Sequence, residues 1–191
     1  MIKLYEEIVS NLKQLNEVDI QNLLNDSKAT DSKRILLSHS LYSEYKGVDS
    51  DGTLLFETDS QTNEDLSYQQ RIFYNRFFEL LDKVDANEEI TQEDVVDILT
   101  SDVYIDCDCP SHLYWGWAYK SWNNDYGLRK ETRKPERNNV DLKGSQCKHV
   151  ISVLDLINKS DTLIDKITLD LNTLFQAYKK RSGSTKNDGS V

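Results

Sequence analysis

The sequence predicts a helix-rich α+β fold, because helical and strand-like patterns both recur along a chain with few structure breakers. The 191 residues are enough for one domain of ordinary size. Hydrophobic residues make up 38% and charged residues 29%, and there are only seven glycines and two prolines. This composition is typical of a globular protein rather than a collagen-like or disordered one. No stretch approaches the roughly 20 apolar residues of a membrane span, so we expect no membrane partner.

The N-terminal region predicts a helical hairpin over residues 1–30. Apolar residues recur at helical spacing over residues 2–15, and a second short helix is indicated over residues 18–24. Glu6 and Glu7 lie inside the first helical pattern, where a signal peptide would carry basic residues followed by an apolar run. We therefore expect the chain to remain in a reducing cytoplasm.

Two apolar segments on either side of the sequence DSDG, at residues 49–52, predict a β-hairpin. The segments cover residues 34–48 and 53–60, and Gly52 can supply the positive φ angle of a tight turn. A calcium-binding loop is the alternative interpretation. It requires carboxylates at its first and twelfth positions, where this register places Gly47 and Thr58.

The segment from residue 63 to residue 84 predicts a long amphipathic helix. Its apolar residues fall on one stripe at intervals of three, four and seven: Leu66, Phe73, Phe77, Leu80, Leu81 and Val84. Thr91 and Asp94 then provide an N-cap and an acidic first turn for a helix over residues 92–100. A strand is expected from residue 102, so the first cysteine pair should lie at the end of a strand.

The last third of the chain predicts two more helices. One covers residues 149–157, and an amphipathic C-terminal helix follows over residues 158–180. Residues 181–191 are small and polar, so we expect a flexible tail. An α+β core over residues 31–157 therefore lies between the helical hairpin and the C-terminal helix.

The three cysteines form a pattern typical of a structural zinc site. Cys107 and Cys109 are separated by one residue, and Cys147 and His149 are likewise separated by one. An odd number of cysteines in a reducing compartment does not form a closed disulfide framework. Three thiolates and one imidazole complete a tetrahedral shell with no open position for substrate, which predicts one structural Zn²⁺.

Other interpretations of these residues remain open. The cysteines could be small buried hydrophobes, or Cys147 and His149 could form a catalytic thiol pair. His39 and His112 have no evident partner in the sequence, and His112 is a weak substitute for one of the ligands.

The arrangement C-x-C followed by C-x-H resembles the SWIM-type zinc finger. In that family a β-hairpin carries the first two ligands and the start of a helix carries the last two. A closer resemblance is to a zinc-binding structural protein of large tailed bacteriophages, carried by "LYWGWAY", "ETRKPERNN" and "GSQCKHVISVL". The chain departs from that pattern at Asn138-Asn139, where Asn-Pro is expected, and at "PSH" after Cys109. The resemblance covers about residues 100–157 and implies a zinc-stabilised virion component, near the portal, neck or tail, that is not an enzyme.

The aromatic run after Cys109 is expected to form the second strand of this zinc module. Leu113, Trp115 and Trp117 would then be buried together over the metal ligands. The remaining aromatic residues and a nearby basic run would form an exposed surface that binds protein or single-stranded nucleic acid. The candidate residues of this surface are Tyr114, Trp122, Tyr126, Arg129, Arg133 and Arg137.

The charge distribution favours protein assembly over nucleic-acid binding. The chain has a net charge of -10, yet residues 126–148 contain seven basic and three acidic residues. An acidic body repels a polyanion, whereas complementary faces help subunits to assemble. We therefore expect a virion structural protein, assembled in the cytoplasm of a bacterial host, whose partners are other virion proteins or copies of itself. A SWIM-type nucleic-acid-binding accessory protein is the alternative. The sequence contains no phosphate-binding loop and no nucleophile with an evident base, so we do not expect an enzyme.

Overall fold

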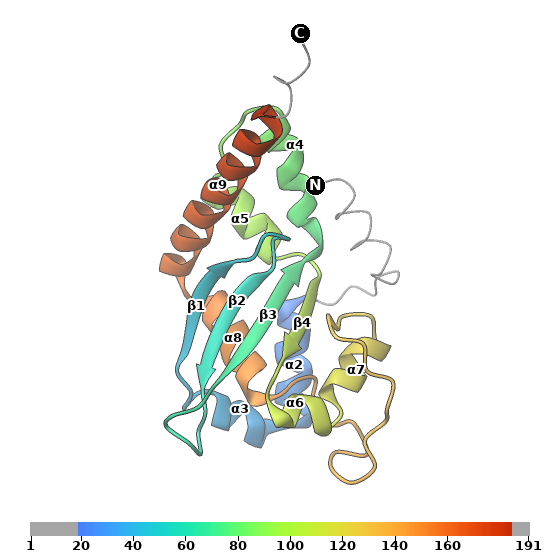
Figure 1. Cartoon of the computed structure of the whole chain (residues 1–191). Coiled ribbons are helices and arrows are strands. Elements are labelled where there is room, and N and C mark those ends of the chain that lie inside the picture. Colours follow the sequence, from blue (N-terminus) through green and yellow to red (C-terminus); the bar gives the residue numbers. More distant parts are fainter. Residues whose placement is uncertain (1–18, 185–191) are drawn as a thin grey trace.

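A four-stranded antiparallel sheet organises the part of the chain that the computed structural model describes, residues 19–184 (Figure 1). Its strands follow one another in the order β1 (Ser43–Val48), β2 (Leu54–Asp59), β3 (Ser67–Tyr74) and β4 (Val103–Cys107). Together with the helices, this sheet confirms the predicted α+β class. Among the described helices, none has the length and apolar character needed to cross a lipid bilayer.

The helices lie mainly behind the sheet and at its two ends (Figure 1). Helix α8 crosses behind all four strands, α2 and α3 pack against α8, and α9 contacts both α5 and β1. The short helices α6 and α7 lie beyond β4. The bounds of the helices are α2 (Ile20–Thr30), α3 (Ser32–Ser38), α4 (Glu79–Asp85), α5 (Gln92–Leu99), α6 (Pro110–Tyr114), α7 (Trp117–Asn123), α8 (Lys148–Lys159) and α9 (Asp161–Ser184).

The predicted hairpin is present as β1 and β2. Leu54 and Phe56 are buried and alternate with half-buried Leu55 and Glu57, as expected for a strand with one face on the core. The connecting turn contains Gly52 at φ +88°, the positive angle predicted for it. The first part of the expected strand is instead helix α3, because the Asp31 side chain accepts the backbone N–H of Arg34 and caps a helix there.

The long helix predicted over residues 63–84 is wrong in its first half. The structure has β3, then a 3-10 helix η1 (Asn75–Phe78), and only then α4. β3 lies between β2 and β4, and its last three residues, Ile72, Phe73 and Tyr74, are all buried. A strand that is covered on both faces has consecutive apolar residues and lacks the usual strand alternation. These residues were therefore assigned to the helical pattern of the segment that follows.

The predicted second strand of the zinc module is also wrong, because the aromatic run forms α6 and α7. Gly116, at φ +85°, separates the two helices. The side chains expected to be buried together therefore differ in exposure: Trp117 is fully buried while Trp115 is 40% exposed. Cys107 lies on β4, which pairs with β3 rather than with a strand following it.

The remaining element predictions agree with the structure apart from their bounds. α2 corresponds to the second predicted helix of the N-terminal hairpin, whereas the first, over residues 2–15, lies outside the described residues. α5 has the expected N-cap, completed by a capping box in which Thr91 and Asp94 bind each other's backbone N–H groups. α9 extends to Ser184, past the predicted end at residue 180, and residues 185–191 of the predicted tail lie outside the described part.

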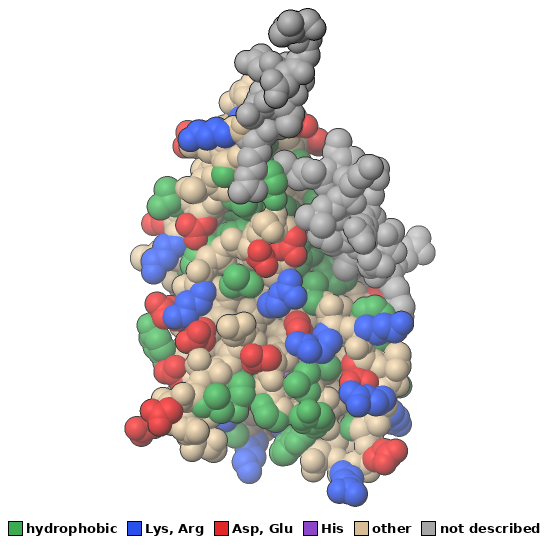
Figure 2. Space-filling view, viewed as in Figure 1, with side chains coloured by type: hydrophobic (Ala, Val, Ile, Leu, Met, Phe, Trp, Pro, Cys, Tyr) green, Lys and Arg blue, Asp and Glu red, His purple; other side chains and the backbone are tan. Residues whose placement is uncertain are grey.

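The open face of the sheet carries charges of both signs. Figure 2 shows basic and acidic side chains interspersed over the strands, with hydrophobic side chains gathered near the lower end of the sheet. Lys46 Nζ lies 2.6 Å from Glu44 and 3.8 Å from Glu57, and Arg71 lies 3.7 Å from Asp51. This face therefore lacks the single-sign potential that would attract a polyanion.

Replacing Gly52 by alanine is expected to lower the free energy of unfolding by about 2 kcal/mol or more. The new Cβ would lie 2.3 Å from the ring of Phe77, which is buried, and it would also occupy a left-handed backbone conformation. Gly47→Ala is the matched control, because Gly47 also has a positive φ but no heavy atom lies within 4 Å of its Cβ position. Gly47→Ala should cost about 1 kcal/mol. Urea denaturation measures both values, and equal losses would contradict the steric argument.

Candidate metal centre

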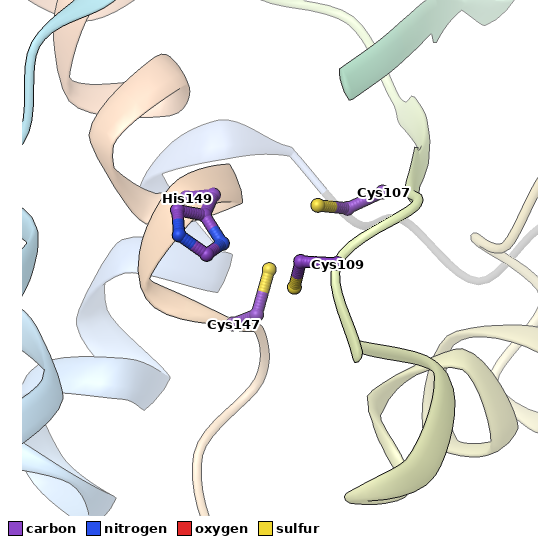
Figure 3. Close-up of side chains that lie close together, drawn as sticks. All are labelled: Cys107, Cys109, Cys147 and His149. Atoms are coloured by element: carbon purple, nitrogen blue, oxygen red, sulfur yellow. The ribbon is translucent and has the colours of Figure 1, made fainter. Parts of the chain in front are cut away.

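Four predicted ligand residues meet at one end of the sheet (Figure 3). One ligand atom from each of Cys107, Cys109, Cys147 and His149 lies within 4.8 Å of the other three, close enough to hold a metal ion. All four side chains are buried, and the two most exposed, Cys107 and His149, show only 1% and 3% of their surface. The structure therefore brings together the group that the sequence predicted.

Local geometry explains how each pair of ligands is presented. Cys107 is the last residue of β4, and Cys109 is the N-cap of α6, with Pro110 at the first helical position. Asp108 points outward between them, and its carboxylate accepts the backbone N–H of Gln69 at 2.9 Å. The second pair lies at the start of α8, where Cys147 is the N-cap. The positive end of the α8 dipole favours a thiolate at this position.

Hydrogen-bond donors contact two of the sulfurs. The backbone N–H of His112 donates to Cys109 Sγ at 3.2 Å, and Gln70 Nε2 approaches Cys107 Sγ at 3.5 Å. Gln70 is itself held by two bonds, one from the Thr58 hydroxyl to its Oε1 and one from its Nε2 to the carbonyl of Tyr68, both 2.7 Å. N–H donors stabilise negative charge on sulfur, so this surrounding layer suits thiolates.

Without a metal, the pKa values of Cys109 and Cys147 are shifted in opposite directions. Hydrogen bonds from Cys107 and Cys147 lower the pKa of Cys109 to about 4. Burial raises the pKa of Cys147 well above its usual range, so this thiol keeps its proton at neutral pH. Both ring nitrogens of His149 are buried without a hydrogen-bond partner among the described residues. A cation that replaced the protons would satisfy sulfur and imidazole together, so the residues fit a metal ion.

His112 lies beneath the cluster and is not one of the four ligands. Its side chain is fully buried, and burial lowers its pKa, so the imidazole is neutral. Nε2 of His112 lies 3.6 Å from Oδ1 of Asp106. Arg129 binds the same carboxylate with two nitrogens, Nε to Oδ1 at 2.9 Å and Nη2 to Oδ2 at 2.8 Å. His39, the other histidine without a predicted partner, is exposed and forms the C-cap of α3.

Of the six residues predicted to form an exposed surface, Tyr126 is buried and Trp122 is half-buried, while the other four are exposed. Tyr126 is 4% exposed and its hydroxyl donates to the carbonyl of Ser145, which corrects its assignment to the surface. Arg129 is committed to Asp106, and Arg133 forms a local pair with Glu131 at 2.6 Å. The other three predicted residues differ in exposure: Tyr114 and Arg137 are exposed, and Trp122 is half-buried.

Arg34 is a site residue that the sequence did not reveal. Its guanidinium carbon lies 4.0 Å from the centre of the Trp117 ring and 5.7 Å from that of Trp115. The two indoles stack on each other, with ring centres 6.1 Å apart. These contacts join α3 to the start of α7. Two of the three tryptophans thus form a support beside the cluster, and no local sequence signal links them to Arg34.

The chain was compared with known protein families, curated proteins and solved structures. None of them matches it. The assignment of the cluster as a metal centre therefore depends on its geometry and donor chemistry.

Arg129→Ala is expected to lower the free energy of unfolding by about 2 kcal/mol, because it leaves the carboxylate of Asp106 buried without its cation. The value lies below the usual range for a buried pair because the Arg129 side chain is 45% exposed. Arg133→Ala is the control and should leave stability nearly unchanged, since the Arg133 side chain is 80% exposed and its charge is screened by solvent. Chemical denaturation distinguishes the two variants. An Arg129→Ala variant with an unchanged free energy of unfolding would contradict the structural role of Arg129.

Adding Zn²⁺ to metal-free protein at pH 7 is expected to release at least one proton per chain. The proton comes from Cys147, whose pKa is raised by burial and whose sulfur must become a thiolate to bind a cation. For the same reason the apparent affinity should fall as the pH is lowered. Titration calorimetry in two buffers of different ionisation enthalpy measures the release, and identical heats in both buffers would contradict it.

Proposed function

We propose that the ion held by this cluster is one Zn²⁺ per chain. Three thiolates and an imidazole form a donor set that zinc favours, in contrast to the oxygen ligands preferred by calcium and magnesium. The donor atoms are spaced closely enough to surround one ion. The C-x-C and C-x-H pairs of the SWIM-type pattern support the same proposal.

We propose a structural role for the zinc. The single observation that carries this proposal is the completeness of the shell: four buried protein ligands leave no position for water or substrate. The ligands also tie the end of β4 to the start of α8 across the irregular segment between α7 and α8. That segment, residues 124–147, is joined to β4 by an isolated bridge between Ile105 and Gly127 and by the ion pair of Arg129 with Asp106. A metal that fixes both ends of this connection stabilises the fold, and the protein need not be an enzyme.

The biological role that we propose is assembly within the virion of a tailed bacteriophage. Support comes from the sequence resemblance over about residues 100–157 and from the structural character of the metal centre. The partners would be other virion proteins or further copies of this chain, joined in the cytoplasm of the bacterial host. Tyr114 is 67% exposed beside the centre and offers an aromatic contact of the kind that interfaces use. Mass-spectrometric detection of the chain in purified phage particles tests this location.

A nucleic-acid-binding accessory protein is the second candidate function. The observation that favours it is the exposure of Lys130, Lys134 and Arg137 on the loop between α7 and α8. No ion pair with a described residue engages these three side chains. A strand bound there would lie beside the metal centre, but against an acidic chain of net charge -10.

Native mass spectrometry of the purified protein, before and after chelation, tests the structural zinc and the assembly role together. We expect one zinc per chain in a defined oligomer that dissociates when the metal is removed. Cys147→Ser should abolish zinc retention and unfold the region, because one thiolate and one end of the tether are lost.

His39→Ala is the matched control for this experiment, since His39 is exposed and lies outside the cluster. It should keep its zinc and its oligomeric state. A Cys147→Ser protein that remains folded and forms the same oligomer without zinc would refute the structural role. A zinc-bound monomer would retain the metal centre but remove the support for assembly from copies of this chain.

A further inference from the structure

A groove of about 510 Å³ lies over the metal centre. It is enclosed by α3, the connection from β2 to β3, the start of α6 and the start of α8. Two of the metal ligands, Cys109 and His149, form part of its floor. Its volume falls within the range of sites that bind small molecules. We call it the cationic groove, for the three basic side chains in its walls: Lys33, Arg34 and Lys148.

The charge of the cationic groove is opposite to that of the chain as a whole. Asp31 is the one acidic residue among those lining it, and it pairs with Nε of Arg34 at 2.8 Å. Lys148 donates to Gln61 at 2.7 Å, and its charge also interacts with Cys109 in the floor. Lys33 is exposed and forms no ion pair with any described residue. A net positive site therefore remains on a protein of net charge -10, which favours an anionic ligand.

An aromatic wall stands beside these cations. Trp115 lines the groove and is 40% exposed. Its ring is held in place by stacking on Trp117, which is fully buried, with an angle of 25° between the planes. Tyr68 lines the same groove and packs against His149 at 4.7 Å between ring centres. A planar ring that is fixed before binding loses little freedom when another planar group stacks on it.

We propose that the cationic groove binds a nucleoside phosphate. The base lies against Trp115, the phosphate is bound by Lys33 and Arg34, and the hydroxyls of Thr62 and Ser111 are within the same groove to contact the sugar or phosphate. An inorganic anion would use the cations but leave the aromatic wall without a role. The ligand can be a free nucleotide or one unit of a single-stranded nucleic acid, since both present the same base and phosphate. The inference does not depend on the assembly role.

Binding to the full-length, zinc-loaded protein at low salt tests the proposal. The probes are thymidine monophosphate by calorimetry, a short fluorescein-labelled oligothymidylate by anisotropy, and inorganic phosphate as the anion without a base. Lys33→Glu removes a phosphate contact and should weaken binding about tenfold. Trp115→Leu keeps apolar bulk but removes stacking and should also weaken binding about tenfold. Zinc content and circular dichroism of each variant verify that the metal centre is intact.

Lys166→Glu is the matched control, because it makes the same change of charge at an exposed position of α9 outside the groove. Losses in Lys33→Glu and Trp115→Leu with no loss in Lys166→Glu support the proposal. Binding of the monophosphate then identifies a free nucleotide as sufficient, and binding of the oligonucleotide alone identifies a single strand. Binding of neither probe, or an equal loss in Lys166→Glu, overturns the proposal. Unchanged binding by Trp115→Leu, with inorganic phosphate competing equally, overturns it in favour of a simple anion site.

Discussion

The burial of three thiols and one imidazole in a single cluster is the constraint on which this end of the structure depends. A buried thiolate needs a nearby positive charge, and a buried imidazole nitrogen needs a partner. When protein atoms alone surround them, Cys147 retains its proton and His149 has no hydrogen bond to any residue of the described range 19–184. A divalent cation satisfies both requirements. It also links β4 to α8, so the irregular segment between them is fixed at both ends.

The metal centre could be predicted because its geometry is encoded over very short distances. One intervening residue fixes the relative positions of Cys107 and Cys109, and the same is true of Cys147 and His149. The capping box of Thr91 and Asp94 was recognisable for the same reason. Short spacing limits the conformations that two residues can share, so a pattern of residue types carries structural information.

The elements that the sequence mispredicted are those whose environment comes from distant parts of the chain. The apolar end of β3 is covered on both faces by other elements, and this double burial removed the alternation that identifies a strand. The basic run after Tyr126 looks continuous in the sequence, yet Arg129 binds Asp106, 23 residues earlier, while Arg133 binds its near neighbour Glu131. Arg34 precedes the four strands in the sequence and Trp117 follows them, yet the guanidinium of Arg34 lies over the Trp117 ring. Spacing alone does not predict such contacts, because tertiary packing selects them.

The metal centre and the cationic groove share their structural supports. His149 and Cys109 belong to both, α8 carries Lys148 between two ligands, and α3 is attached by the contact of Arg34 with the tryptophan pair. Loss of the ion frees the starts of α6 and α8, so the walls of the groove lose their fixed separation. A ligand that binds only the ordered groove then binds the metal-loaded form more tightly. Because coupling between two sites is reciprocal, the ligand raises the affinity for the metal by the same factor. If the proposed structural ion is bound, it controls in this way whether a neighbouring site exists.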